Sequence, residues 1–91
     1  MKVLIDGINY DVEQTMTNDD LYGYVSFFDQ TIYMNKNLKK DQQFHTLIHE
    51  VLEAINDAND LELEHRTLSV IANSFQSFIR NNLPLLTKMS K

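Results

Sequence analysis

Three side chains that can bind a metal ion lie one turn apart on a predicted helix in the middle of the chain. Residues 44–55 read Phe-His-Thr-Leu-Ile-His-Glu-Val-Leu-Glu-Ala-Ile. At 100° per residue, His45, His49 and Glu53 follow one another along a single helical face. Imidazoles and carboxylates four residues apart on a helix can reach the same ion. This face is the strongest candidate for chemistry in a chain that has no cysteine and no Gly-rich phosphate loop.

The same segment is one residue type away from His-Glu-x-x-His, the helical motif that holds zinc in metallopeptidases. Glu53 stands where that motif has its second histidine. Glu50 is rotated by about 100° from His49, which is the placement of the glutamate that takes a proton from water in such enzymes. The sequence therefore indicates a variant His-Glu-x-x-Glu motif, with Glu50 as a candidate general base.

A catalytic zinc ion needs three protein ligands, so a third must come from elsewhere in the chain. The remaining histidine, His65, lies at the start of the second predicted helix. An antiparallel helix pair with a short loop would return it toward the first helix. We expect Zn²⁺ to be bound by His49, Glu53 and His65. His45 could be a fourth ligand, a replacement for Glu53 or a group that supports a ligand.

The composition narrows the class of protein. Lys and Arg number 8 against 13 Asp and Glu, for a net charge of −5, which argues against a nucleic-acid surface because such surfaces need clustered basic residues. Without cysteine, only His and carboxylates remain as metal ligands. No run approaches the roughly 20 apolar residues of a membrane-spanning helix, and the first residues have no signal-peptide hydrophobic region. We expect a cytoplasmic protein.

The first 35 residues predict a small antiparallel sheet of three or four strands. Asp6-Gly7 tolerates the positive φ of a two-residue hairpin turn, and Asp29-Gln30 predicts a second tight turn. Residues 13–20 are polar and predict a loop. The strands expected from β-branched and aromatic content are Met1–Ile5, Ile8–Val12, Tyr22–Phe28 and Thr31–Met34.

The hydrophobic period then changes from two to about 3.6, which predicts two antiparallel helices packed on the sheet, at about 41–57 and 64–81. Asp41 is a candidate N-cap of the first helix. The apolar stripe expected to face the sheet consists of Phe44, Leu47, Ile48, Val51, Leu52 and Ile55.

Asn81-Asn82 and then Pro84 should end the second helix, because the residue before proline avoids helical angles. The remaining residues, 84–91, predict a loosely held C-terminal tail. We therefore expect a single α+β domain over residues 1–83.

Residues 43–56, Gln-Phe-His-Thr-Leu-Ile-His-Glu-Val-Leu-Glu-Ala-Ile-Asn, resemble small phage- and prophage-encoded proteins described as zincin-like metallopeptidases. Those proteins are distantly similar to the peptidase domain of the ImmA/IrrE group. The likeness extends over residues 1 to about 82 and is most specific at 46–55 and around His65. It implies a minimal zincin-like domain, a zinc ion, and a protein or peptide substrate or partner in a bacterial host cell.

The chain departs from the usual zincin pattern at two positions. Glu53 replaces the second histidine of the first helix, and His65 stands downstream where a carboxylate often lies. Together the two departures exchange ligand types while keeping two histidines and one carboxylate. The resemblance therefore still implies a zinc site formed by His49, Glu53 and His65.

Three hypotheses follow. In the first, the chain is a metal-dependent, peptidase-like hydrolase in which Glu50 deprotonates a water and an extended peptide adds to a sheet edge. In the second, it is a phage accessory protein that binds a host or phage protein on the same scaffold without catalysis. In the third, the histidines are boundary residues that bind no metal. Glu50→Gln separates the first two, because it keeps the shape of the side chain and removes the base.

Overall fold

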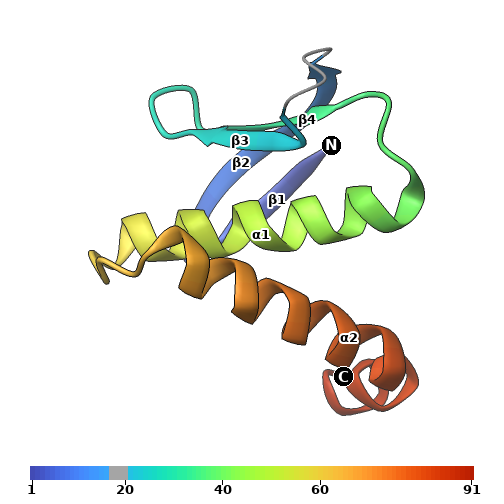
Figure 1. Ribbon diagram of the computed structural model, residues 1–91. Helices are drawn as coiled ribbons and strands as arrows, with labels where there is room; N and C mark the ends of the chain where they lie inside the picture. Colours follow the sequence, from blue (N-terminus) through green and yellow to red (C-terminus); the bar gives the residue numbers. More distant parts are fainter. Residues whose placement is uncertain (17–20) are drawn as a thin grey trace.

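The computed structural model, which describes residues 1–16 and 21–91, confirms an α+β fold with a small sheet followed by two helices (Figure 1). The elements along the chain are β1 (Lys2–Ile5), β2 (Ile8–Met16), β3 (Gly23–Ser26), β4 (Thr31–Asn35), α1 (Lys40–Ala58) and α2 (His65–Met89). In Figure 1 the sheet lies on one side of α1 and α2 lies on the other. The first helix is therefore the central layer of the molecule.

β1 and β2 pair as an antiparallel hairpin around Asp6-Gly7. Asp6 has a φ of 49° and Gly7 a φ of 79°. A two-residue hairpin turn of the mirror-image type requires positive φ at both central positions, which Asp-Gly supplies at little steric cost. The predicted turn is confirmed.

The four strands lie in the order β1-β2-β4-β3, and the sheet is mixed. β4 pairs antiparallel with β3 but parallel with β2, so the expectation of an antiparallel sheet is wrong for that one pair. Burial explains the difference, because β4 carries Ile32 and Met34, which are almost fully buried. Because β4 lies between β2 and β3, both backbone edges of this apolar strand are hydrogen-bonded to a neighbour. The chain therefore reaches the edge of the sheet at β3 and returns through its middle.

β2 is longer than predicted. Its last residue is Met16, so the first part of the predicted loop over residues 13–20 is strand. Glu13 pairs with Tyr33 on β4, and this ladder extends β2 beyond the hydrophobic alternation that marks its first half. Residues 17–20 lie outside the described part of the chain.

The connection between β3 and β4 is also larger than predicted. Ser26 pairs with Thr31, which leaves residues 27–30 as the turn in place of a two-residue turn at Asp29-Gln30. The Ser26 hydroxyl accepts a hydrogen bond from the Asp29 amide at 3.3 Å. Gln30 completes the turn with a φ of 51°. A side-chain bond to the backbone thus stabilises a wider turn than the dipeptide alone indicates.

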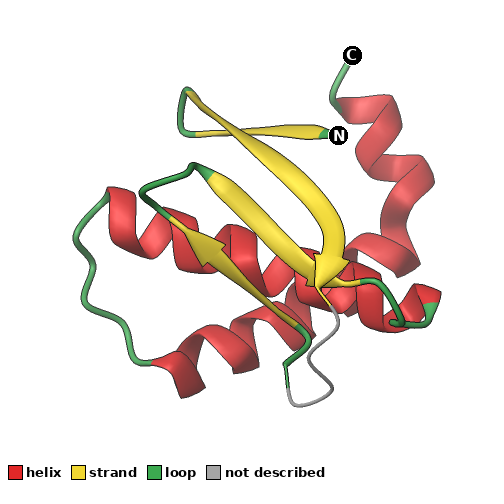
Figure 2. Ribbon diagram, turned by 90° about the horizontal axis from the view of Figure 1, so that it is seen from above, coloured by secondary structure: helices red, strands yellow, loops and turns green. Residues whose placement is uncertain are grey.

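The hydrophobic core lies between the sheet and α1, and Figure 2 shows the strands crossing over that helix. Members of the predicted apolar stripe pack there, namely Leu47, Val51 and Ile55. The most deeply buried residues of α1 follow a different line, at successive turns: Thr46, Glu50 and Ala54. Two of these three are polar, so hydrophobic periodicity did not identify this line. α2 packs on α1 through Leu68 and Ala72, its own buried residues.

The N-cap of α1 lies two residues before the predicted one. Lys39 occupies the N-cap position, and its amide donates to Gln42 Oε1 at 3.0 Å. Asp41 lies in the first helical turn, where its carboxylate forms an ion pair with Arg80 of α2 at 3.1 Å. The predicted Asp41 cap is wrong because the Gln42 side chain reaches back and begins the helix earlier.

α2 has a break where the sequence predicted its end, but the chain remains helical beyond it. Asn82 has non-helical angles, with φ of −131° and ψ of 18°. The helix then resumes to Met89, and Pro84 falls in the first turn of this last segment, where a missing N–H costs nothing. The predicted tail over 84–91 is therefore mostly helical. Neither helix of the described chain combines the length and the apolar character that crossing a bilayer requires.

Candidate metal centre

α1 and α2 form an antiparallel hairpin, so residues late in α1 contact residues early in α2. The side-chain contacts between them are His45 with Gln76, His49 with Ser69, and Glu53 with His65. The residues that the sequence placed on one face of the first helix therefore face the second helix. This hairpin is the element that brings His65 back to the motif.

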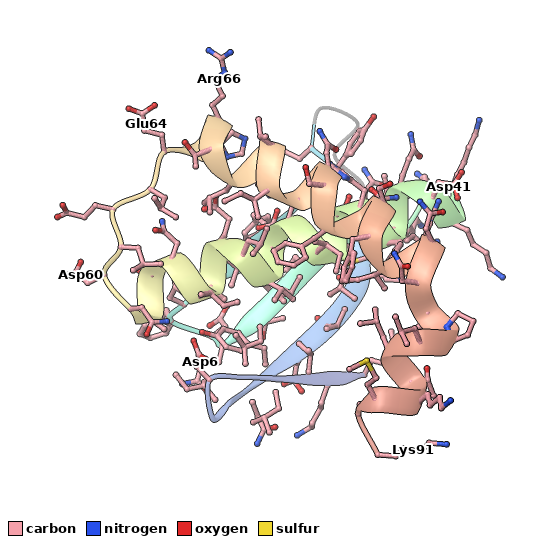
Figure 3. All side chains as sticks on the ribbon, turned by 90° about the horizontal axis from the view of Figure 1, so that it is seen from below. Asp6, Asp41, Asp60, Glu64, Arg66 and Lys91 are labelled. Carbon is pink, nitrogen blue, oxygen red and sulfur yellow. The ribbon has the colours of Figure 1, made fainter. Side chains whose placement is uncertain are left out.

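Asn56 sets the geometry of the hairpin loop. Its Oδ1 accepts a hydrogen bond from the Leu63 amide at 2.9 Å, and its Nδ2 donates to the Leu63 carbonyl at 3.3 Å. The loop ends at Glu64, and α2 begins at His65. In Figure 3 Glu64 and Arg66, the neighbours of His65, point outward from the start of α2. One α1 side chain thus anchors the loop immediately before the proposed ligand.

His49, Glu53 and His65 bring donor atoms to within 4.8 Å of one another. His65 Nδ1 lies 3.6 Å from Glu53 Oε1. The rings of His49 and His65 stand edge to face, with 4.7 Å between their centroids. The three residues expected from the sequence are adjacent in the structure, and they form a group that could hold a metal ion.

The donor atoms of His49, Glu53 and His65 suit a divalent cation in their chemical type and in the distances between them. Glu53 Oε1 is buried and has no hydrogen-bond partner among the described residues, an arrangement that is costly unless a cation satisfies the oxygen. Ligand atoms with bonds of about 2.0–2.1 Å to a tetrahedral ion lie roughly 3.4 Å apart, close to the 3.6 Å between Glu53 and His65. The His65 side chain is 76% exposed, so it is free to rotate and shorten the remaining distances.

Glu50 lies beside this group on the buried line of α1. Its Oε2 is 3.2 Å from His49 Nδ1, and the two side chains are only 8% and 12% exposed. Burial raises the pKa of the Glu50 carboxyl above its ordinary value, while the hydrogen bond with His49 lowers it. A carboxylate with a raised pKa is a stronger base than an ordinary one, which makes Glu50 a candidate for proton transfer.

His45 is separate from the three donors. Its Nδ1 lies 3.0 Å from Gln76 Oε1, a neutral amide that satisfies one ring nitrogen. The structure therefore brings His45 to the same interface as His49, one turn away, but leaves it outside the group that could hold a metal.

A pocket of about 310 Å³ opens beside the candidate ligands. It is lined from three sides, by Leu21, Tyr22 and Gly23 next to the sheet, by His45, Thr46, His49 and Glu50 of α1, and by His65 and Ser69 of α2. A Cβ atom at Gly23 would lie 2.7 Å from the Tyr33 carbonyl oxygen and 2.8 Å from Thr46 Cγ2. Glycine therefore allows β3 to approach α1 closely enough to form one wall.

Sequence reasoning missed the residues that complete this pocket. Ser69 follows His65 by four positions, so helical periodicity alone would have placed the two on one face of α2. Nothing in the sequence marked Gly23 or Thr46, because their role depends on how β3 crosses α1. Thr46 Oγ1 is buried and has no hydrogen-bond partner among the described residues.

Comparison of the chain with protein-family models, with curated proteins and with solved structures finds no match. The geometry of the helical hairpin is therefore the basis for assigning a function.

Proposed function

We propose that this protein binds Zn²⁺ through His49, Glu53 and His65 and acts as a metal-dependent hydrolase of peptide-like substrates. The observation that supports the proposal is the convergence of the three donors, one of which is a buried carboxylate oxygen that accepts no hydrogen bond from the described residues. Two imidazoles and one carboxylate are a common donor set for catalytic zinc, with a further position left for water or substrate.

A bound zinc ion would polarise a carbonyl group and lower the pKa of a water molecule. Glu50 would accept a proton from water in the pocket, since it lines that pocket beside His49 and its pKa is raised by burial. His65, at the exposed start of α2, would complete the ligand set after a small rotation. These are the roles that the sequence suggested, from the His-Glu-x-x-Glu spacing for His49, Glu50 and Glu53 and from the helix pair for His65.

An extended peptide has a place next to this pocket. β3 is the last strand of the sheet order, so its outer edge has no partner among the described strands. Gly23, the first residue of β3, and the two residues before it, Leu21 and Tyr22, line the pocket itself. A peptide that added to this edge by backbone hydrogen bonds would pass the candidate metal ligands.

Metal analysis of protein purified without a polyhistidine tag tests the first step. We expect about one zinc per chain and a lower melting temperature after EDTA treatment. Protein that holds no zinc after incubation with the ion, and that melts at the same temperature with and without EDTA, would contradict the proposed site.

Hydrolysis is tested separately with the zinc-loaded protein on a mixture of peptides, with cleavage read by mass spectrometry. Glu50→Gln should bind zinc and lose cleavage, because the amide keeps the shape of the side chain but cannot act as base.

A second candidate is a non-catalytic accessory protein that binds a host or phage protein. The exposed aromatic residues of the β3–β4 turn favour it, since Phe27 is 41% and Phe28 98% exposed, and aromatic side chains are enriched at binding surfaces. Full zinc binding with no peptide cleavage would favour this function over hydrolysis. In either case the resemblance of residues 46–55 to small phage-encoded proteins supports a role in the cytoplasm of a bacterial host cell.

A further inference from the structure

Ser69 has a contact that the metal site does not require. Its Oγ lies 3.3 Å from His49 Nε2, in the wall of the pocket. The hydroxyl comes from α2, one turn after His65, and the imidazole comes from α1. A serine hydroxyl next to a histidine nitrogen is the first half of the arrangement by which hydrolases activate a nucleophile.

The second half lies on the other side of the same ring. Glu50 Oε2 is 3.2 Å from His49 Nδ1, and both side chains are largely buried. In the tautomer of His49 that carries its proton on Nδ1, this nitrogen donates a hydrogen bond to the Glu50 carboxylate. The lone pair of Nε2 is then directed at the Ser69 hydroxyl. Ser69, His49 and Glu50 thus form a continuous sequence of nucleophile, base and orienting carboxylate.

We propose that the metal-free protein has a second activity, in which Ser69 accepts an acyl group from a small carboxylic ester. The pocket, of about 310 Å³, is at the lower end of the size range of ligand sites, so it suits a short acyl chain. Leu21 and Tyr22 provide apolar surface for that chain. This proposal goes beyond the metal-dependent reaction and uses His49 in a different role.

The chemical step needs no further reactant than the ester and water. Ser69 Oγ attacks the ester carbonyl carbon as its proton moves to His49 Nε2, and a new C–O bond forms. The bond between that carbon and the leaving alkoxide breaks, and the alkoxide receives the proton from Nε2. Water then attacks the acyl-serine with the same proton transfers, which releases the carboxylic acid and regenerates the Ser69 hydroxyl.

The two activities exclude each other at His49. A metal ion on Nε2 takes the lone pair that would accept the Ser69 proton. Zinc should therefore suppress acylation of Ser69, and the two reactions can be measured independently on one sample.

The test uses the full chain in EDTA with p-nitrophenyl acetate, followed by peptide mass spectrometry. We expect a burst of p-nitrophenolate and an acetyl group on Ser69. Ser69→Ala should reduce the burst rate at least about tenfold, whereas Ser74→Ala, an exposed serine on the same helix, should leave it unchanged. Glu50→Gln keeps Ser69 in place and should also slow the burst, because its amide can donate to Nδ1 and reverse the tautomer.

An equal burst in Ser69→Ala, or acetyl groups found only on histidine, lysine or the amino terminus, would overturn the acyl-transfer proposal. Zinc titration of the same protein distinguishes this failure from failure of the metal site. Acetylation of Ser69 in a chain that binds no zinc would reject the metal-dependent function alone. Acetylation that continues unchanged in a chain shown to be saturated with zinc would reject the claim that the two activities exclude each other.

Discussion

The interface between α1 and α2 has two halves, each with a histidine of α1, and the side chains around the two histidines differ. Near the loop, His49 lies against His65, Ser69 and the buried carboxylate of Glu50. One turn away, His45 meets only the neutral amide of Gln76 among these contacts. Whether a histidine at this helix interface can bind a metal or transfer a proton therefore depends on its neighbours and not on its position along the helix face.

The half that contains His45 ends in contacts at the protein surface. Arg80 pairs with Asp41 at 3.1 Å, and its guanidinium lies 5.1 Å from the centre of the Phe44 ring. The Arg80 and Asp41 side chains are 42% and 84% exposed, so their ion pair contributes little to stability. The first half differs, since it buries a carboxylate oxygen of Glu53 that accepts no hydrogen bond from the described residues. This difference predicts that substitutions in the two halves will have unequal effects on stability and on zinc binding.

Zinc binding should show the largest difference between the halves. At a free zinc concentration of about 100 times Kd, a site in the folded state contributes about 2.7 kcal/mol, which corresponds to a rise in Tm of roughly 10–20 °C for a domain of this size. Glu53→Ala should abolish the rise and His45→Ala should retain it. Differential scanning fluorimetry with and without zinc measures both, and an equal loss in the two variants would remove the distinction between the halves.

Approach of the sheet to α1 at the pocket should depend on Gly23. In Gly23→Ala the new Cβ would meet the Tyr33 carbonyl and Thr46 Cγ2 at less than 3 Å, so the unfolding free energy should fall by about 1–3 kcal/mol. Gly7→Ala is the matched control, because a Cβ there meets nothing within 4 Å and the cost comes only from its φ of 79°. Urea denaturation compares the two. A smaller loss at Gly23 than at Gly7 would show that β3 does not rest on α1 in this way.

Glu50→Gln should stabilise the metal-free protein by about 1 kcal/mol at neutral pH, since it removes a buried charge from the site. Burial raises the pKa of Glu50 in the folded state, so the folded state binds the proton more tightly than the unfolded chain does. The wild type should therefore lose stability as pH rises from about 4 toward neutrality, relative to the variant.

Thermal melts in EDTA over that pH range measure the difference between wild type and Glu50→Gln. Glu13→Gln, which changes an exposed carboxylate on β2, should show little change with pH. A difference that grows as the pH falls would contradict the direction expected for Glu50.

The smallest effect is expected at the opposite end of the interface. Arg80→Ala removes an ion pair whose side chains are 42% and 84% exposed and a contact with Phe44, so it should cost no more than about 1 kcal/mol. Zinc affinity, measured by calorimetry, should be the same as in the wild type. A several-fold change in affinity would show that the two halves are coupled.

The local features of this protein could be predicted where neighbouring residues decide them. The Asp6-Gly7 turn follows from the φ preference of two adjacent residues, and the α1 face that carries His45, His49 and Glu53 follows from helical periodicity. The sequence also predicted a break near Asn82, but as the end of the helix, whereas the chain continues as helix to Met89.

The tertiary structure decided everything that depends on contacts between distant segments. β4 lies between β2 and β3 because burial of its apolar side chains outweighs the simpler antiparallel order. His65 could be proposed as a ligand from the sequence, but its distance from Glu53 depends on how Asn56 holds the loop. Ser69 became visible only when the helices were paired, since a hydroxyl is ordinary on a helix and distinctive only 3.3 Å from an oriented imidazole.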